Sequence, residues 1–295
     1  MEYVLLSTTG RLARVELTEP YAVTRAAQAH QSRTAHDVIV AAAPVSAGVG
    51  LVTSAGRALR VDHAELPLLA AGPWSLAEAP TAASLLPLVD DEVAVTVWTL
   101  DIDTPPLALG TRHGAVKRVV PEYKDWSSWE VMALKSGDEV VGAGQASDSD
   151  ELVFITSGGQ LLRLSAREVR AQGRAAGGMA GIKLPENSQV LAFSAIARAD
   201  REQALVTTLA TGPRPDAQLT AKVTPLAQYP AKGRATGGVR CHRFLKDQDH
   251  LLLAWAGLPP ARAGDADGDF RNLPALDERR DGTGTKVYAS FASVG

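Results

Sequence analysis

The sequence predicts an all-β protein in which similar units are arranged as a propeller-like ring. Three observations predict this class. Short apolar and β-branched segments alternate with glycine turns, helix signals are short and few, and one hairpin pattern recurs at intervals of about fifty residues. Because each unit of such an array buries its faces against its neighbours, we expect the 295 residues to form one toroidal domain.

The clearest unit covers residues 152–184. An apolar, β-branched strand over residues 152–156 is followed by the turn Ser157-Gly158-Gly159 and by an alternating strand over residues 160–164. A glycine-rich loop that carries an arginine and a short apolar run complete the unit. The rest of the chain resembles imperfect copies of it.

The copies align on the turn glycine and on a basic residue four positions after it. The glycines are Gly10, Gly56, Gly114 and Gly159, and the basic residues are Arg14, Arg60, Arg118 and Arg163. In the fifth copy an enlarged turn begins at Gly212, and Lys222 is the basic residue. The sixth copy is weaker, with a strand over residues 250–256 before Gly257. The units are predicted to span residues 1–48, 49–105, 106–150, 151–200, 201–249 and 250–295.

Further elements are expected between the hairpins. Strands are predicted over residues 37–43 and 93–100, one helical turn over 166–170, and a closing strand over 286–291. The polar stretch between Gly257 and Gly284, rich in Pro, Gly and Asp, is predicted to be a loop.

Composition places the chain among ordinary globular proteins, with 45% hydrophobic and 21% charged residues. The single cysteine, Cys241, excludes an internal disulfide and fits a reducing cytoplasm. No apolar run reaches membrane-spanning length, so no membrane partner is expected. A strand begins almost directly after Met1, and we therefore expect the domain to be part of a longer chain.

Charge is unevenly distributed along the chain, although the net charge is only −3. Residues 61–111 contain eight acids and no Lys or Arg, whereas residues 222–246 contain six bases and no acid. This asymmetry indicates either a basic sector on an otherwise neutral or acidic ring, or a scatter of solvated charges.

Catalytic and metal-binding patterns are not evident. The six histidines have no ligand spacing, and the single cysteine has no cysteine partner for a zinc site. Residues 265–269 faintly resemble a calcium loop, but the glycine and the final acidic ligand are out of place. The glycine-rich segments lack the Gly-Lys-Ser/Thr ending of a phosphate loop. We expect no metal and no cofactor.

Two nearly identical loops give a sharper signal. Gly173-Arg174-Ala-Ala-Gly177-Gly178 recurs as Gly233-Arg234-Ala-Thr-Gly237-Gly238. Glycines allow close backbone approach, and an arginine offers a forked cationic donor suited to phosphate. The alternative is a tight blade-to-blade turn whose arginine caps carbonyls. The basic residue after each turn glycine has a similar alternative, an exposed charge that protects a strand edge. Its recurrence in five units indicates a shared orientation on the ring.

Three segments resemble the C-terminal domain of the A subunit of bacterial DNA gyrase and topoisomerase IV. They are LVFITSGGQLLRLSAREVRAQGRAAGGMAGIKL (152–184), QYPAKGRATGGVRCHRF (228–244) and LALGTRHGAVKRVVPEY (107–123), the last followed by LKSGDEVVGA (134–143). The resemblance implies a six-bladed β-pinwheel, a propeller-like disc of four-stranded blades that exchange strands with their neighbours. It also implies that duplex DNA bends around a basic rim.

The resemblance further implies the partners of a larger enzyme. In the family this non-catalytic domain follows a breakage-reunion domain that carries the catalytic tyrosine, and it works with an ATPase B subunit in an ATP-dependent type II topoisomerase. The expected location is the cytoplasm, in association with the nucleoid. None of the five tyrosines follows the arginine expected beside a catalytic tyrosine, so we predict no enzymatic activity for this chain alone.

The sequence departs from gyrase in the first blade. Gyrase carries a Q-R-R-G-G-K-G box there, but TEPYAVTRAAQAHQSRTAHDV (18–38) has Arg25, Gln28, Gln31 and Arg33 without the glycine pair and the lysine. This difference favours a topoisomerase IV-like A subunit.

The residues expected to contact DNA centre on the fourth and fifth blades. They are Arg14, Arg60, Lys117, Arg118, Arg163, Arg170, Arg174, Lys183, Lys222, Lys232, Arg234, Arg240 and Arg243. The alternative function is a propeller that binds a protein or hydrolyses glycosides at its central channel. DNA binding requires bases on the outer rim, whereas a glycosidase requires a converging carboxylate pair at the axis.

Overall fold

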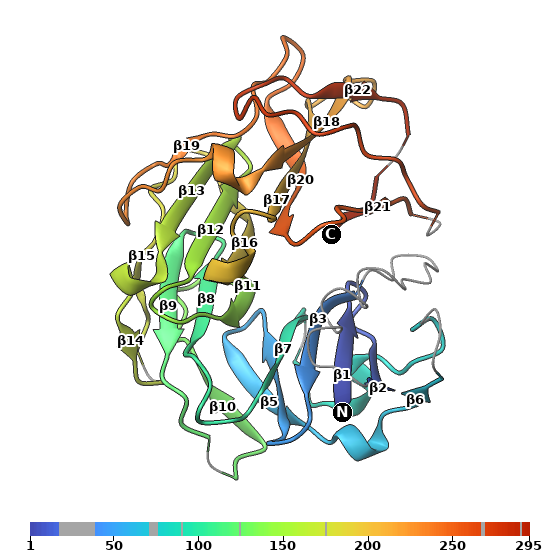
Figure 1. Cartoon of the computed structure of the whole chain (residues 1–295), viewed down its shortest axis with the longest axis vertical. Coiled ribbons are helices and arrows are strands. Elements are labelled where there is room, and N and C mark those ends of the chain that lie inside the picture. Colours follow the sequence, from blue (N-terminus) through green and yellow to red (C-terminus); the bar gives the residue numbers. More distant parts are fainter. Residues whose placement is uncertain are drawn as a thin grey trace.

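The chain forms an arc of small β-sheets in the computed structural model (Figure 1). The structure describes residues 1–17, 39–70, 76–89, 91–123, 125–174, 176–266, 269–289 and 291–295. Within these residues there are five sheets of four or five strands and a sixth sheet of two strands. The all-β, propeller-like class is confirmed, but the number of complete blades is five, not six.

Each blade has an inner strand, a two-strand hairpin and one or two outer strands, in that order. Blade 1 contains β3 (Ile39–Pro44), β1 (Glu2–Ser7), β2 (Leu12–Glu16) and β6 (Leu68–Leu69). Blade 2 contains β7 (Ala94–Thr99), β4 (Val49–Thr53), β5 (Arg57–Val61) and β10 (Ser128–Glu130). Blade 3 contains β11 (Val140–Gln145), β8 (Leu107–Thr111), β9 (Ala115–Val119), β14 (Ala171–Gln172) and β15 (Met179–Ala180).

The last two blades repeat the pattern. Blade 4 contains β16 (Val190–Ile196), β12 (Glu151–Thr156), β13 (Gln160–Ser165) and β19 (Val239–Arg240). Blade 5 contains β20 (His250–Gly257), β17 (Leu205–Thr211), β18 (Leu219–Pro225) and β22 (Thr285–Val287).

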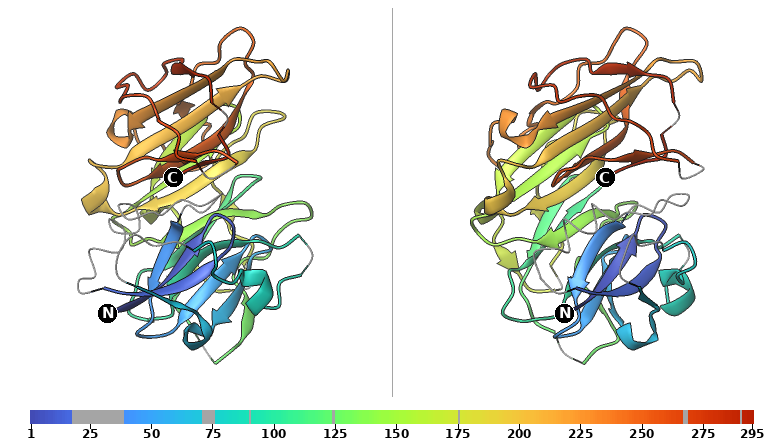
Figure 2. Two further views of the ribbon diagram at one scale, coloured as in Figure 1. Left: turned by 90° about the vertical axis from the view of Figure 1, so that its right-hand side faces the viewer. Right: turned by 45° about the vertical axis from the view of Figure 1, so that its right-hand side comes forward.

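The helical elements of the described residues are short: α2 (Ala82–Leu85), η1 (His63–Glu65), η2 (Ala166–Glu168), η3 (Arg198–Asp200) and η4 (Leu226–Gln228). Figure 2 shows that the first and last blades lie toward opposite ends of the long axis.

The outer strand of each of the first four blades comes from the sequence that follows the next blade's hairpin. For example, β14 and β15 follow the β12–β13 hairpin of blade 4 but pair with β9 of blade 3. Likewise β19 follows the β17–β18 hairpin and pairs with β13. We call residues 126–134, 169–184 and 229–246, which carry these outer strands for blades 2 to 4, the exchange segments, and we extend the term to residues 276–289, whose strand β22 covers the same edge of blade 5. The first three interlock neighbouring blades, whereas residues 276–289 follow β20 of blade 5 itself.

Hairpin strands lie between two packed faces. Every residue of β4, β8 and β12 is buried, which explains their continuous apolar character in place of strict alternation. The core clusters are shared between blades. One of them joins Ala108 and Val116 of blade 3 to Phe154 and Phe193 of blade 4, whose rings lie 4.8 Å apart. The blades therefore bury their faces on each other, as the repeat predicts.

Residues 250–256 do not begin a sixth blade. They form β20, which pairs along its whole length with β17 as the inner strand of blade 5. Beyond Gly257 no second hairpin strand follows among the described residues; β21 (Ala263–Gly264) and β23 (Ser293–Val294) pair with each other in a two-stranded sheet. The physical reason is composition, because the polar, Pro- and Gly-rich stretch after Gly257 cannot supply two apolar strands.

Residues 18–38, the segment in which the sequence departs from the gyrase pattern, lie outside the described part of the chain. None of the described helices is long and apolar enough to span a membrane.

Candidate functional site

The recurring turn glycines are docking points for the exchange segments. Gly56, Gly114 and Gly159 all have positive φ, at 74°, 84° and 71°. The carbonyl of Gly114 accepts hydrogen bonds from the N–H groups of Gly181 and Ile182, at 2.8 and 3.1 Å. A Cβ at Gly56 would lie 2.4 Å from the carbonyl oxygen of Met132. The turn position of the repeat therefore requires glycine for two reasons: its positive φ and the close approach of the exchange segment.

The arginines four positions after these glycines donate hydrogen bonds to main-chain carbonyls at the start of the exchange segments or in the turns before them. Arg163 donates to both carboxylate oxygens of Glu151, at 2.5 and 2.8 Å, and to the carbonyl of Tyr229 at 2.9 Å. Arg118 donates to the carbonyls of Ala166 and Val169, at 2.9 and 3.1 Å. Each acceptor carbonyl belongs to the turn that leads into an outer strand.

Arg14 and Arg60 repeat the arrangement in the first two blades. The Nε of Arg14 donates to the carbonyl of Leu66 at 2.8 Å, and the Nε of Arg60 donates to the carbonyl of Trp126 at 3.2 Å. All four arginines thus share one orientation, as the recurrence predicts, but this orientation directs them between blades. The sequence signal that could have identified this role is the short turn that follows each hairpin.

Lys222 occupies a different position from these arginines. Parallel pairing places Arg14 opposite Leu68, Arg118 opposite Ala171 and Arg163 opposite Ala231. In blade 5 the corresponding residue is Val223, which pairs with Leu276. Lys222 is therefore equivalent to Lys117. Because the enlarged turn puts Lys222 ten residues after Gly212, the count from the glycine could not fix the register, and the basic residue was placed one position too far along.

The two equivalent lysines are buried. Lys117 is 0% and Lys222 1% exposed. The Nζ of Lys117 donates to the carbonyls of Val131, Arg174 and Ala176, at 2.7, 2.6 and 2.6 Å. Burial lowers the pKa of each lysine to about 8.

The structure therefore moves part of the expected contact set away from the surface. Lys117, Arg118, Arg163 and Lys222 are buried, because an outer strand or its lead-in turn covers the second hairpin strand that carries them. For these residues the interpretation as an outer-rim charge is corrected to a structural one. Arg14 and Arg60 are half-buried and bound to carbonyls in the same way.

The exposed bases of the expected contact set lie on the exchange segments themselves. Arg170 precedes β14, Lys183 follows β15, and Arg240 ends β19, on strands that lie along the outer side of the arc (Figure 1). Lys232 and Arg243 are exposed on the same segment as Arg240. Residues 169–184 and 229–246 contain no Asp or Glu. The outer surface of blades 3 and 4 is therefore lined by segments of one sign of charge.

The arginines of the two similar loops are only half-exposed. The guanidinium carbon of Arg174 lies 3.9 Å from the centre of the Trp126 ring. Arg234 donates from Nη1 to the carbonyl of Ala180 at 2.6 Å. A Cβ at Gly178 would lie 2.6 Å from the carbonyl of Val116, and one at Gly238 would lie 2.2 Å from that of Leu161. The last glycine of each loop thus lets the exchange segment pack closely against the second hairpin strand of the blade that it covers.

The loops also join one exchange segment to the next. The N–H of Lys183 donates to the carbonyl of Thr236 at 2.9 Å, and the N–H of Ala235 donates to that of Gly181 at 2.6 Å. The outer surface therefore continues from blade 3 to blade 4 without a break in main-chain contact.

The acidic residues of 61–111 that the structure describes lie between the end of β5 and the start of β8. Asp62 and Glu65 follow β5, and Asp91 precedes β7. Glu92 is buried in an ion pair with Arg57 at 2.5 Å. These acids thus precede the hairpin of blade 3, whereas the exposed bases of the expected contact set lie on the outer segments of blades 3 and 4.

Within the described part of the chain, the strands of the inner wall carry no carboxylate pair. Each inner strand contacts that of the next blade. The inner strands β3, β7, β11, β16 and β20 contain no Asp or Glu. A glycosidase centred on the axis would require such a pair. Within the described residues, no group of three or more His, Cys, Asp and Glu side chains is placed to hold a metal ion.

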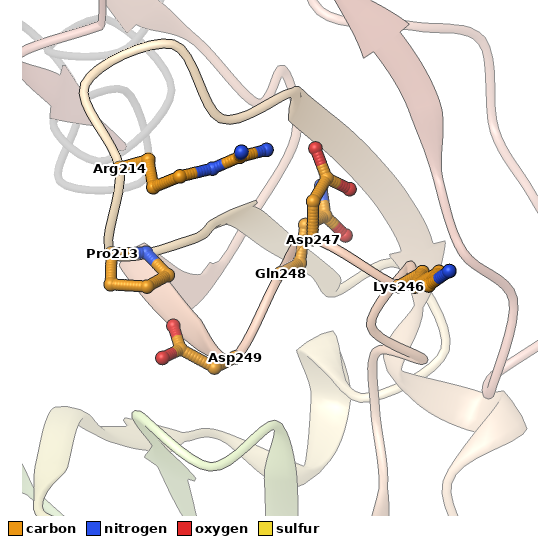
Figure 3. A pocket seen from close by; sticks show the side chains of 6 residues that line it. All are labelled: Pro213, Arg214, Lys246, Asp247, Gln248 and Asp249. Atoms are coloured by element: carbon orange, nitrogen blue, oxygen red, sulfur yellow. The ribbon is translucent and has the colours of Figure 1, made fainter.

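A hollow of about 610 Å³ lies at one end of blade 5 (Figure 3). It contains two carboxylates, but both are engaged: Asp247 accepts from the N–H of Gln218 at 3.1 Å, and Asp249 lies 2.5 Å from Nδ1 of His250. The Gln218 N–H also holds the pKa of Asp247 below its usual value, whereas a general acid needs a raised one. The lining residues are Pro213, Arg214, Lys246, Asp247, Gln248 and Asp249.

The sequence model of the family described as DNA gyrase C-terminal domain, beta-propeller, matches residues 150–197 and 220–252. These two segments of the chain are similar to this family. Over 164 residues, the chain is 34% identical to the DNA gyrase A subunit of Deinococcus deserti, covering 53% of this chain and 19% of the relative. Over 192 residues it is 30% identical to the DNA gyrase A subunit of Escherichia coli, covering 63% of this chain and 20% of the relative. It thus spans about a fifth of the length of these relatives.

Solved structures extend the likeness in fold over the whole chain. The C-terminal domain of DNA topoisomerase IV matches with a TM-score of 0.76 at 19% identity, covering 100% of this chain and 93% of that chain. The DNA gyrase A C-terminal domain matches with a TM-score of 0.67 at 18% identity, covering 99% and 98%.

Proposed function

We propose that the chain is the DNA-binding and DNA-bending domain of a type II topoisomerase A subunit. The observation that carries the proposal is the pair of acid-free exchange segments, whose exposed bases lie side by side on the outer surface of blades 3 and 4. The similarity to the DNA gyrase C-terminal domain family supports the same function. Duplex DNA would follow this convex surface.

Contacts would be made to phosphates rather than to bases. Long, exposed Lys and Arg side chains suit phosphate oxygens, and the longest α-helix of the described residues has four residues, too few to read a major groove. Binding should therefore be nearly independent of sequence. Because bending a short duplex costs a few kcal/mol, several contacts must act together.

The proposed contact set is smaller than the one expected from sequence. It keeps Arg170, Lys183, Lys232 and Arg240, with Arg174, Arg234 and Arg243 as partly engaged members; Arg243 is paired with Asp281 at 3.0 Å. Arg14, Arg60, Lys117, Arg118, Arg163 and Lys222 are assigned instead to holding the blades together.

The wider assignment follows the resemblance. The domain would itself be non-catalytic and would need no cofactor. It would guide a DNA segment toward a breakage-reunion domain of the same polypeptide, in an enzyme with an ATPase B subunit, in the cytoplasm at the nucleoid. The missing glycine pair and lysine in residues 18–38 favour a topoisomerase IV-like protein over a gyrase-like one.

The experiment is a salt titration of duplex binding, combined with closure of relaxed circular DNA in the presence of the domain. Log affinity should fall with log salt by about 0.9 for each phosphate neutralised. Duplexes of unrelated sequence should bind alike, and closure should leave a small change in linking number. A flat salt dependence, or strong preference for one sequence, would contradict the proposal and favour a protein-binding propeller.

A further inference from the structure

A third loop of the same construction lies on blade 5, over residues 279–284. Its sequence, Arg-Arg280-Asp-Gly-Thr-Gly284, lacks the adjacent glycine pair and so does not stand out as a repeat. Three independent contacts nevertheless make it equivalent to the loops at 173–178 and 233–238.

The first contact is made by the last glycine. Gly178, Gly238 and Gly284 all have positive φ, at 79°, 70° and 72°. A Cβ at Gly284 would lie 2.7 Å from the carbonyl of Ala221, just as one at Gly178 would lie 2.6 Å from that of Val116. In each blade the loop ends with a glycine pressed against the second hairpin strand.

The second contact comes from the neighbouring exchange segment. The N–H of Lys183 donates to the carbonyl of Thr236 at 2.9 Å, and the N–H of Arg243 donates to the carbonyl of Gly282 at 3.0 Å. Thr236 and Gly282 each stand two residues before the last glycine. The third loop is therefore joined to blade 4 as the second is joined to blade 3.

The third contact comes from the buried lysine. Lys117 donates to the carbonyl of Arg174 at 2.6 Å, and the equivalent Lys222 donates to the carbonyl of Arg280 at 2.5 Å. Arg174 and Arg280 both stand four residues before the last glycine, as does Arg234. Lys117 and Lys222 thus occupy the same position on the second hairpin strand, and each binds the main-chain carbonyl of the arginine that stands four residues before the last glycine of the loop.

We propose that Arg280 is a DNA phosphate contact equivalent to Arg174 and Arg234, so that the arc of contact covers blades 3, 4 and 5. The inference rests on the proposed function. Arg280 is exposed, whereas Arg174 lies on Trp126 and Arg234 is bound to a carbonyl. Its guanidinium can therefore reach a phosphate without giving up such a partner, and it should contribute more affinity than either.

A second base follows the same register. Arg240 and Lys286 each stand two residues after the last glycine, on β19 and β22, and both are exposed. Arg279 differs from its neighbour, because Asp277 binds it at 3.0 Å and leaves it less available to a phosphate. The inference therefore concerns Arg280 and does not extend to every base of the segment.

The test compares charge reversals in one fluorescence titration of a labelled duplex at low salt. Arg280→Glu should weaken binding about tenfold and lower the salt slope by about 0.9. Arg198→Glu is the matched control: it reverses an exposed arginine in η3, between blades 4 and 5 but away from the exchange segments. It should have a much smaller effect. Lys222 binds the main-chain carbonyl of Arg280, so the side-chain change leaves that bond intact.

The outcomes separate this inference from the proposed function. If the unmodified domain shows no salt-dependent binding, the proposed function fails and the inference fails with it. If the domain binds and Arg174→Glu or Arg234→Glu weakens it, but Arg280→Glu matches Arg198→Glu, the third loop is not a contact. Arg280→Gln should give a smaller loss than Arg280→Glu, and an equal loss would indicate a folding defect and overturn the assignment.

Discussion

Replacing Arg163 by methionine should destabilise the domain without removing a DNA contact. Arg163 is 8% exposed, and its guanidinium binds Glu151 through two hydrogen bonds at 2.5 and 2.8 Å. Methionine keeps much of the side-chain volume. The loss therefore isolates the charge and the hydrogen bonds.

The magnitude follows from the carboxylate left behind. Removing one partner of a buried ion pair costs about 3–5 kcal/mol, because the other charge stays buried and unpaired. Arg201 lies 3.8 Å from Glu151 and can offset part of this loss. We therefore expect the free energy of unfolding to fall by about 3 kcal/mol. The double variant Glu151→Gln/Arg163→Met should recover more than half of it, since no stranded charge remains.

Urea unfolding followed by circular dichroism gives the free energies, with Arg167→Met as the exposed control in the following turn. That control should change stability by less than about 0.5 kcal/mol. A loss in unfolding free energy below about 1 kcal/mol for Arg163→Met would refute the structural role of the Arg163–Glu151 pair. So would a fall in DNA affinity equal to that of Arg174→Glu, measured where the variant is fully folded.

Two further predictions concern the docking of the loops. Gly238→Ala should cost at least about 2 kcal/mol in unfolding free energy, because φ is 70° and the new Cβ would lie 2.2 Å from the carbonyl of Leu161. Gly237→Ala is the control, since its nearest neighbour would be 3.8 Å away, and equal losses in the two variants would contradict the docking. The second prediction concerns pH. Burial lowers the pKa of Lys117 to about 8 from 10.5, so between these values the unfolded chain binds more protons than the folded one. Compared with Lys117→Met, the free energy of unfolding of the unmodified domain should therefore rise with pH from about 8 to 10.5, and parallel pH profiles would show that Lys117 is not buried as described.

The strand content and the hairpin repeat could be predicted from sequence because they depend on local patterns. The expected strand over residues 93–100 is found as β7 over Ala94–Thr99. The expected helical turn at 166–170 is found as the 3-10 turn η2 over Ala166–Glu168. The number of blades could not be predicted in this way. The strand at 250–256 has the same apolar pattern whether it begins a blade or completes one, and only its pairing with β17 decides between them.

The candidate site was predicted less well, because charge type does not reveal which side of a strand is covered. Arg118 and Arg170 are equally basic in sequence, yet one is buried under an exchange segment and the other is exposed on it. Strand exchange is a long-range property. It determines that the second hairpin strand is not an edge, and nothing in the hairpin itself records this.

Strand exchange also imposes an order on synthesis and folding. β13 of blade 4 is left with an open edge until β19 has been made, and β19 lies beyond the whole β17–β18 hairpin. As the chain leaves the ribosome from its N-terminus, each of the first four blades is therefore incomplete until the hairpin of the next blade and the strand after it have been made. The same rule applies to a truncation, which would leave unfinished not only the blade it cuts but also the intact-looking blade before it. The unit of folding in this protein is accordingly a pair of neighbouring blades, although the unit of repetition in its sequence is one.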